Sequence, residues 1–186
     1  MSYSTVFLDR DGVINVDSPD YIKSWEAFRF IPGSLDAIAR LTRAGIAVIV
    51  ITNQSAVNRG MISPEELETM HRRMRRAVAD SGGRITDIFF CPHRPDENCD
   101  CRKPKPGLIL AARDRHGLDL ASAVMVGDSA KDILTGRAAG CGATVLVKTG
   151  NGEAAMQSLA KKGTLPDHVA NDLAAAAHWI LDQRHA

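Results

Sequence analysis

The chain lacks any hydrophobic run that could cross a membrane. Its longest apolar stretch covers residues 46–51, whereas a transmembrane helix needs about 20 apolar residues. The opening sequence MSYSTVFLDRDG leads directly into a strand-like segment and shows none of the pattern of a signal peptide. We therefore expect a cytoplasmic protein with no membrane partner.

A large net charge of either sign is also missing. Lys and Arg number 23 and Asp and Glu number 22, which gives a formal net charge of +1. Such a chain has no overall field to hold nucleic acid, so any attraction for an anionic substrate must be local. Low-complexity tracts and internal repeats are absent. The length of 186 residues predicts one globular domain, 1–186, with a sizeable core.

Short apolar segments alternate with helix-like stretches along the chain. The strand-like segments are 6–8, 46–51, 88–90, 124–126 and 144–147. Apolar residues follow a helical spacing in 35–41, 67–78, 108–112 and 130–139. This alternation predicts an α/β fold, a Rossmann-like parallel sheet flanked by helices on both faces.

Local signals support these boundaries. Ser63-Pro64-Glu65-Glu66 is typical of an N-cap followed by a proline and an acidic first turn. Gly45 and Gly117 lie where helices should end. About 35 residues separate Asp11 from the second strand-like segment, which leaves room for a short flap but not for a cap domain. A site at this end should therefore be open.

Three aspartates follow strand-like segments. Asp9 and Asp11 lie in FLDRDG, and Asp128 lies in MVGDSAKD. The ends of parallel strands face the same edge of a sheet, so these residues should converge in one crevice. Crowded carboxylates repel one another unless a divalent cation lies among them, and hard oxygen ligands suit Mg²⁺. The sequence therefore predicts a Mg²⁺ site formed by Asp9, the backbone carbonyl of Asp11, and Asp128.

The motifs also follow one order. Asp-x-Asp-Gly comes after a strand, Thr52 ends the next strand, and Lys103 and then Gly-Asp-x-x-x-Asp complete the set. In this order the chain resembles the haloacid dehalogenase-like phosphatases from end to end, which implies phosphoryl transfer. Asp9 would be the nucleophile that forms an aspartyl-phosphate, and Asp11 the general acid and base. Thr52 and Lys103 would stabilise the phosphoryl oxygens.

Residues close to Thr52 and Asp128 would assist phosphoryl transfer. The backbone N–H groups of Asn53, Gln54 and Ser55 follow Thr52 and are expected to bind the same oxygens. Asp132 comes one helical turn after Asp128. We expect it to orient Lys103 or a metal-bound water rather than to touch the substrate.

Three of the four cysteines share one short loop. Cys91, His93, Cys99 and Cys101 lie within eleven residues, and they match the soft ligand set of tetrahedral structural zinc. A disulfide is disfavoured in a chain without export signals. We predict Zn²⁺ with four protein ligands, which leaves no open position for catalysis. The remaining cysteine, Cys141, is expected to be a small core residue.

Positive charge gathers beside this zinc loop, 91–101. Arg94 lies within it, and Arg102, Lys103 and Lys105 follow it. Because the whole chain is nearly neutral, this cluster should concentrate positive charge at the crevice. Lys103 would reach the phosphate. Arg102 would bind a second anionic or polar part of the substrate, because the forked guanidinium group suits phosphate.

Longer strings make the resemblance more specific within this superfamily. They are DRDGVIN, TNQS with a nearby RG, CPH with CDCRKPKPG, and MVGDSAKD. Together they are similar to the D-glycero-D-manno-heptose 1,7-bisphosphate 7-phosphatases. This resemblance implies a small phosphorylated sugar as substrate and a role in making activated heptose for lipopolysaccharide or other surface glycans. The substrate contacts that it implies are Asp9, Arg10, Asp11, Asp17, Ser18, Pro19, Asp20, Thr52, Asn53, Gln54, Ser55, Arg102 and Lys103.

Two other functions stay open. Histidinol phosphatases share the zinc loop and the string CDCRKPK, so histidinol phosphate is an alternative substrate. A zinc-stabilised, non-catalytic interaction module is an alternative of another class, although every catalytic residue type is present. Ser129 departs from the lysine that some family members carry after the motif aspartate, which leaves the preferred anomer open. Nothing in the sequence indicates an interface, so we expect a monomer.

Overall fold

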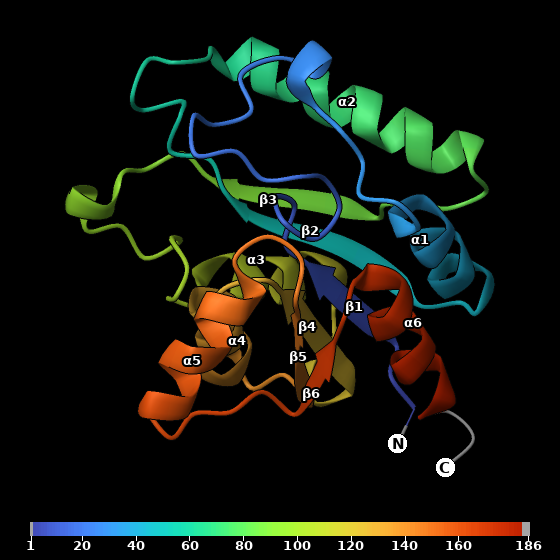
Figure 1. Ribbon diagram of the computed structural model, residues 1–186. Coiled ribbons are helices and arrows are strands. Elements are labelled where there is room, and N and C mark those ends of the chain that lie inside the picture. The colour runs from blue at the N-terminus through green and yellow to red at the C-terminus, as the bar shows by residue number, and fades with distance from the viewer. Residues whose placement is uncertain (1, 184–186) are drawn as a thin grey trace.

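Six parallel strands form one sheet in this computed structural model, which describes residues 2–183 (Figure 1). The strand order is β3-β2-β1-β4-β5-β6. The strands are β1 Thr5–Leu8, β2 Ala47–Asn53, β3 Asp87–Cys91, β4 Ala123–Gly127, β5 Ala143–Val147 and β6 His168–Ala170. Residues 1 and 184–186 of the predicted domain lie outside the described range. The predicted α/β fold is confirmed. The sequence did not predict β6, because its three residues are too few to show an apolar pattern.

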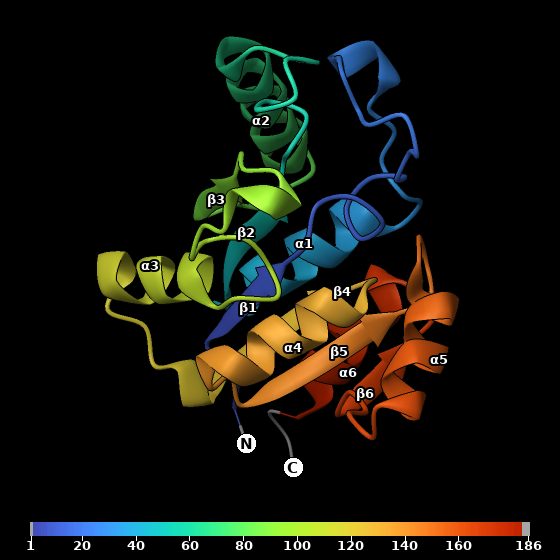
Figure 2. The same cartoon turned by 90° about the vertical axis from the view of Figure 1, so that its left-hand side faces the viewer.

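Helices cover both faces of the sheet (Figure 2). They are α1 Ser34–Arg43, α2 Pro64–Asp80, α3 Gly107–His116, α4 Ala130–Ala139, α5 Gly152–Lys161 and α6 Leu173–Asp182. Side chains of α1, α2 and α6 enter the core on one face, those of α3 and α4 enter the core on the other, and α5 packs against α4 and β5. The predicted N-cap of α2 is confirmed, because Ser63 Oγ accepts from the N–H of Glu66 at 3.1 Å.

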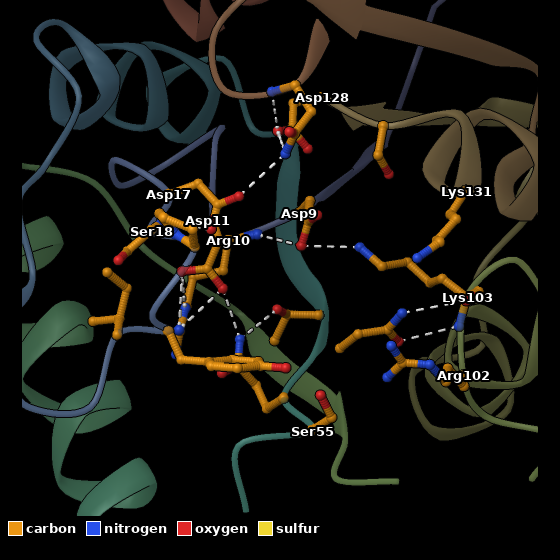
Figure 3. Close-up of a pocket in the computed structure, with 18 residues that line it drawn as sticks. Asp9, Arg10, Asp11, Asp17, Ser18, Ser55, Arg102, Lys103, Asp128 and Lys131 are labelled. Atoms are coloured by element: carbon orange, nitrogen blue, oxygen red, sulfur yellow. Dashed lines mark hydrogen bonds and ion pairs between the residues drawn. The ribbon is translucent and has the colours of Figure 1, made fainter. Parts of the chain in front are cut away.

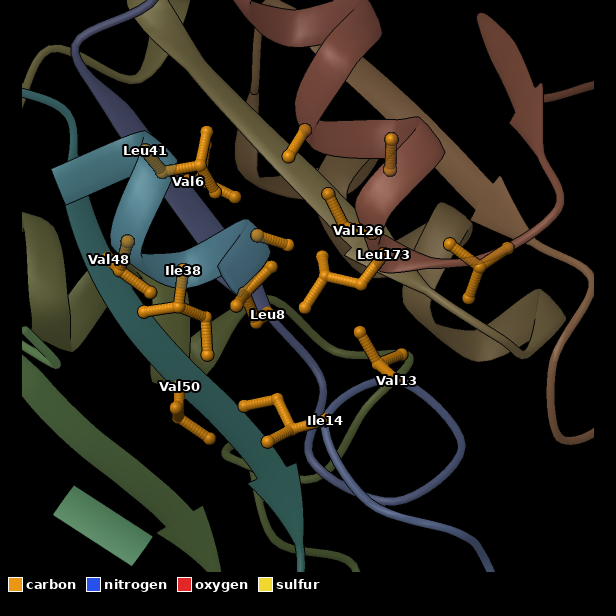
Figure 4. Close-up of a cluster of buried hydrophobic side chains, with 14 of the residues drawn as sticks. Val6, Leu8, Val13, Ile14, Ile38, Leu41, Val48, Val50, Val126 and Leu173 are labelled. Carbon is orange, nitrogen blue, oxygen red and sulfur yellow. The ribbon is translucent and has the colours of Figure 1, made fainter. Parts of the chain in front are cut away.

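The central strand β1 is buried on both faces because its side chains alternate. Val6 and Leu8 enter the core with α1, α2 and α6 (Figure 4), whereas Phe7 enters the core on the α3 side. All three are fully buried, and burying each side chain contributes roughly 1.5–3 kcal/mol. This packing fixes the end of β1, where Asp9 follows.

A flap joins β1 to α1. Its single helical turn, η1 (Trp25–Ala27), lies near α2, where Arg73 pairs with Glu26 at 3.9 Å. Phe28 anchors the flap because its side chain is buried in the core. Within residues 2–183 the segment between β1 and α1 holds no cap domain, as predicted. None of the described helices has the length and apolarity that a bilayer span requires.

Candidate active site

The candidate active site is a cavity at the carboxyl ends of the strands. β2 lies on one side of β1 and β4 on the other, so the loops that follow these strands diverge and leave a crevice. The cavity has a volume of about 340 Å³ (Figure 3). Its lining residues are Asp9, Arg10, Asp11, Asp17, Ser18, Pro19, Tyr21, Ile22, Thr52, Asn53, Gln54, Ser55, Arg102, Lys103, Asp128, Ser129, Lys131 and Asn151.

Asp9 and Lys103 form the centre of this cavity. Lys103 Nζ lies 2.9 Å from Asp9 Oδ1 and also donates to the carbonyl of Ile51 at 3.0 Å. Burial alone would lower the pKa of Lys103, but the charges of Asp132 and Asp9 raise it above its ordinary value. Burial raises the pKa of Asp9 well above its usual range, and the attraction of Lys103 offsets only part of this. A permanent cation is therefore held beside a carboxylate that is costly to ionise.

Asp132 holds Lys103 from the first turn of α4. Asp132 Oδ1 lies 2.6 Å from Lys103 Nζ, and Asp132 Oδ2 accepts from the backbone N–H of Ser129 at 3.0 Å and from its hydroxyl at 2.6 Å. Gly127 leaves the space for this fully buried carboxylate, since a Cβ there would lie 2.1 Å from the Cβ of Asp132. Asp132 therefore contacts Lys103, one of the two partners expected for it from the sequence.

Asp128 enters the cavity from the end of β4, and Asn151 positions it. The backbone N–H of Asn151 donates to Asp128 Oδ2 at 2.8 Å, and its side-chain Nδ2 donates to the same oxygen at 3.2 Å and to Asp17 at 3.1 Å. Gly12 and Gly150 pack so closely that a Cβ on either would lie 2.1 Å from Asp128 Oδ2. Burial is the main cause that raises the pKa of Asp128 to about 6.

These carboxylates fit a hard divalent cation. One oxygen from each of Asp9, Asp128 and Asp132 lies within 4.8 Å of the other two, and a cation among them would relieve the cost of their buried negative charge. Both oxygens of Asp132 contact protein groups, Oδ1 with Lys103 and Oδ2 with Ser129, whereas Asp9 contacts Lys103 and the N–H of Arg10 through Oδ1 alone. Asp9 and Asp128 are therefore the carboxylates that could hold such a cation. The side chain of Asp11 is not part of this group, so the predicted contribution of Asp11 rests on its backbone carbonyl.

Three side chains hold the carboxylate of Asp11. Arg10 donates from Nε at 3.2 Å and from Nη2 at 3.0 Å, Asn15 Nδ2 donates at 2.9 Å, and Gln54 Nε2 donates at 2.8 Å. Burial alone would raise the pKa of Asp11, but Arg10 and the two amides hold it below its usual value. The Arg10 side chain is 1% exposed, so it acts on Asp11 from beneath the cavity surface. These contacts favour the ionised form of Asp11.

β2 is longer than the sequence indicated. Asn53 still pairs with Cys91 of β3, and the N–H of Gln54 donates to the carbonyl of Cys91 at 2.7 Å. The prediction that this N–H binds phosphoryl oxygens is wrong, because the ladder between β2 and β3 occupies it. Thr52 Oγ1 accepts from the side chain of Gln54 at 2.9 Å, and its own O–H can donate to a phosphate.

Asn53 fixes the backbone of Lys103. Its Oδ1 accepts from the N–H of Lys103 at 3.1 Å, and its Nδ2 donates to the carbonyl of Lys103 at 3.2 Å. The neighbouring Arg102 donates to the carbonyl of His93 at 2.9 Å and lines the cavity. The end of β2 and the zinc loop are thus joined at the point where Lys103 turns inward.

The four predicted zinc ligands converge. Cys91 Sγ lies 3.6 Å from Cys99 Sγ and 3.5 Å from His93 Nδ1, and Cys101 Sγ lies 3.5 Å from Cys99 Sγ and 3.3 Å from His93 Nδ1. These separations far exceed a disulfide bond of about 2.0 Å and approach the edge, about 3.8 Å, of a tetrahedron with Zn–S bonds of about 2.3 Å. Burial, together with the neighbouring thiols, raises the pKa of Cys101 to about 12, so three thiolates need a cation to coexist. The donor set fits zinc.

Most of the predicted site residues line one cavity. Asp20 is a predicted contact that does not line it, and its N–H donates to Ser18 Oγ at 3.2 Å. The sequence reasoning missed Lys131 and Asn151. Asn151 follows β5, so the strand-end rule that identified Asp128 could have identified it, whereas no motif marks Lys131. Cys141, predicted to be a small core residue, is partly buried and packs against the core on the α3 side.

Comparisons with known proteins identify close relatives. Residues 100–176 match the family model described as HAD-hydrolase-like. The chain is 48% identical to the D-glycero-β-D-manno-heptose-1,7-bisphosphate 7-phosphatase of Pseudomonas aeruginosa, over 97% of this chain and 99% of that protein. The protein of the same name from Bordetella bronchiseptica is 46% identical, over 96% of this chain and 98% of that protein.

Solved structures show the same fold. The crystal structure of D,D-heptose 1,7-bisphosphate phosphatase from B. bronchiseptica, complexed with magnesium and phosphate, matches with a TM-score of 0.89 and 44% identity, covering 98% of this chain and 99% of that chain. The structure of D,D-heptose 1,7-bisphosphate phosphatase from Burkholderia thailandensis matches with a TM-score of 0.73 and 38% identity, covering 96% and 98%.

Proposed function

The chain belongs to the D-glycero-D-manno-heptose 1,7-bisphosphate 7-phosphatases, within the haloacid dehalogenase-like hydrolases, and on that basis we propose that it removes the C7 phosphate of this sugar bisphosphate. It is a phosphoric monoester hydrolase. The observation that carries the proposal is that Asp9, Lys103 and Asp128, which lie far apart in the sequence, line one cavity at the carboxyl ends of the strands.

Asp9 is the proposed nucleophile. Its carboxylate attacks phosphorus and forms an aspartyl-phosphate as the bond to the C7 oxygen breaks. Lys103, 2.9 Å from Asp9, places a fixed positive charge where an anionic phosphate must approach an anionic carboxylate, which offsets their repulsion. Thr52 would donate its hydroxyl proton to a phosphoryl oxygen.

Asp11 is the proposed general acid and base. It protonates the departing C7 oxygen and later takes a proton from the water that hydrolyses the aspartyl-phosphate. Burial opposes and Arg10 causes the lowered pKa of Asp11, which keeps the carboxylate ionised, the form that accepts a proton in the second step. A substrate phosphate beside Asp11 adds negative charge, which raises its pKa and favours the acid form that the first step requires.

Mg²⁺ is proposed to bind Asp9, Asp128 and the backbone carbonyl of Asp11. When bound, it would neutralise charge between the attacking carboxylate and the phosphate. The support is the group of carboxylate oxygens within 4.8 Å of one another, together with the relative from B. bronchiseptica that was solved with magnesium and phosphate. Asn151 keeps Asp128 in place for this role.

Zinc is proposed to be structural, held by Cys91, His93, Cys99 and Cys101. Its role would be to fold the loop so that the residues directly after it reach the cavity. Arg102 would then contact a second part of the substrate, and the flap residues Asp17 and Ser18 would close the other side of the cavity.

Phosphate release from both anomers of the heptose 1,7-bisphosphate and from histidinol phosphate would test the substrate. We expect kcat/KM for at least one anomer to exceed that for histidinol phosphate by about a hundredfold or more, since a site built for two phosphates leaves its cations unpaired with a single one. Faster turnover of histidinol phosphate would overturn the proposed substrate. Release from none of the three would favour a non-catalytic, zinc-stabilised module.

The biological setting is proposed from the family resemblance. We place the enzyme in the cytoplasm as a monomer, in the synthesis of activated heptose for lipopolysaccharide or other surface glycans. Residues 1–186 would form one phosphatase domain into which the zinc loop, 91–101, is inserted.

A further inference from the structure

Lys131 differs from the other cations at the cavity because its ammonium group has no protein partner among residues 2–183. Arg10 is paired with Asp11, Lys103 is paired with two carboxylates, and Arg102 donates to a backbone carbonyl. No such interaction holds the ammonium group of Lys131 within residues 2–183, although this exposed side chain lines the cavity. An unpaired ammonium group at a substrate cavity is available to a substrate anion.

The position of Lys131 places it at the rim rather than at the reacting centre. It is the second residue of α4, and it lines both the active-site cavity and a neighbouring pocket formed with the zinc loop. Arg102 and Lys103 line the same two spaces. Figure 3 shows Lys131 on the same side of the cavity as these two residues, with Asp17 and Ser18 on the opposite side.

The flap side and the α4 side of the cavity carry different charges. The flap side offers Asp17, Ser18, Pro19 and Tyr21, none of which is positively charged, and Asp17 would repel a phosphate. The α4 side offers the free ammonium of Lys131, close to the positive end of the helix dipole. A second phosphate on a substrate anchored at Asp9 would therefore be stabilised on the α4 side.

We propose that Lys131 binds the C1 phosphate, the one that is not hydrolysed, and thereby sets the preference for a sugar bisphosphate over a sugar monophosphate. This inference rests on the proposed function, because it requires a substrate with a phosphate at each end. Lys131 acts with Arg102, which lines the same two spaces, and it takes no part in the transfer of the C7 phosphate.

The test compares one variant on two substrates. Lys131→Met removes the charge and keeps the length of an exposed side chain, so folding should be unaffected. We expect KM for heptose 1,7-bisphosphate to rise about tenfold, the loss of one charge-assisted hydrogen bond, with kcat within about twofold. KM for heptose 7-phosphate, which lacks the C1 phosphate, should stay within about twofold.

Two matched variants complete the experiment. Lys131→Arg should restore most of the affinity for the bisphosphate, and Lys161→Met, which removes an exposed lysine of α5, should change neither KM. An equal rise in KM for both substrates, or no rise for the bisphosphate, would overturn the role of Lys131. Wild-type protein that does not hydrolyse the bisphosphate would overturn the proposed function itself, and this result is seen before any variant is compared.

Discussion

Asn151 donates two hydrogen bonds to Oδ2 of Asp128, from its backbone N–H at 2.8 Å and from its side-chain Nδ2 at 3.2 Å. The two residues come from neighbouring loops, after β5 and after β4. The backbone contact holds Asp128 in position and the side-chain contact fixes its rotation. The same Nδ2 reaches Asp17 at 3.1 Å, so Asn151 also joins the metal-binding side of the cavity to the flap.

Asn151→Ala should weaken Mg²⁺ binding. The variant keeps the backbone N–H but loses the side-chain contact that orients Asp128, and loss of such a supporting hydrogen bond lowers metal affinity about tenfold. Titration of Mg²⁺ by calorimetry and by activity would measure the change. Asn171→Ala, at an exposed position just before α6, is the matched control. Equal Mg²⁺ affinity in the variant and the wild type would show that Asn151 does not position Asp128.

Asp9→Asn should abolish turnover while leaving the fold intact. An amide cannot form the aspartyl-phosphate, so we expect kcat to fall by at least about a thousandfold. Because burial makes an ionised Asp9 costly, the neutral amide should leave the melting temperature equal or higher. Asp36→Asn, on the exposed side of α1, controls for the loss of a charge. Phosphate release by the Asp9 variant near the wild-type rate would remove Asp9 from its proposed role.

The stability of the protein should fall in mild acid because of His71. Burial, and then the charge of Arg10, lower the pKa of His71 from 6.5 to about 3. A lowered folded-state pKa means that the unfolded chain binds a proton first, so stability is complete above pH 6.5 and is lost as the pH falls toward 3. The loss from this group at pH 5 is about 2 kcal/mol.

Urea unfolding at pH 7 and pH 5 would measure this effect. Between pH 7 and pH 5 the free energy of unfolding of His71→Gln should fall by about 2 kcal/mol less than that of the wild type. His178→Gln, at an exposed position of α6, should show the same fall as the wild type. An identical pH dependence for the wild type and His71→Gln would contradict the assignment.

Protein purified without added zinc should contain about one Zn²⁺ per chain. Cys99→Ser should lose the metal and most activity, because an unfolded loop no longer presents Arg102 and Lys103. Cys141→Ser, outside the ligand cluster, should retain both. Elemental analysis would measure the metal. Less than about half an equivalent in the wild type would argue against the Cys₃His site.

Some of these features could be read from local patterns. Alternating apolar segments indicated five of the six strands, because a strand buried on both faces needs a continuous apolar run. Asp9 and Asp128 were found because polar residues directly after such strands must meet at one edge of a parallel sheet. The cluster of Cys91, His93, Cys99 and Cys101 was predicted because the spacing of such residues within one loop is itself the signal.

Other features depend on chain segments that meet only after folding. The pairing of Gln54 with Cys91, which removes an expected phosphate donor, exists because β3 lies beside β2. The hydrogen bonds from Asn151 to Asp128 form because β5 lies beside β4.

The sequence by itself determined the fold class, the cluster of three cysteines and one histidine, and the aspartates of the cavity, because residue type and spacing carry that information. Only the tertiary structure decided which groups are free to act. It paired Arg10 with Asp11 and the N–H of Gln54 with Cys91, and it left Lys131 unpaired within the described residues. Whether a charge is neutralised or available depends on which side chains lie within a few ångströms, and spacing along the chain does not specify that.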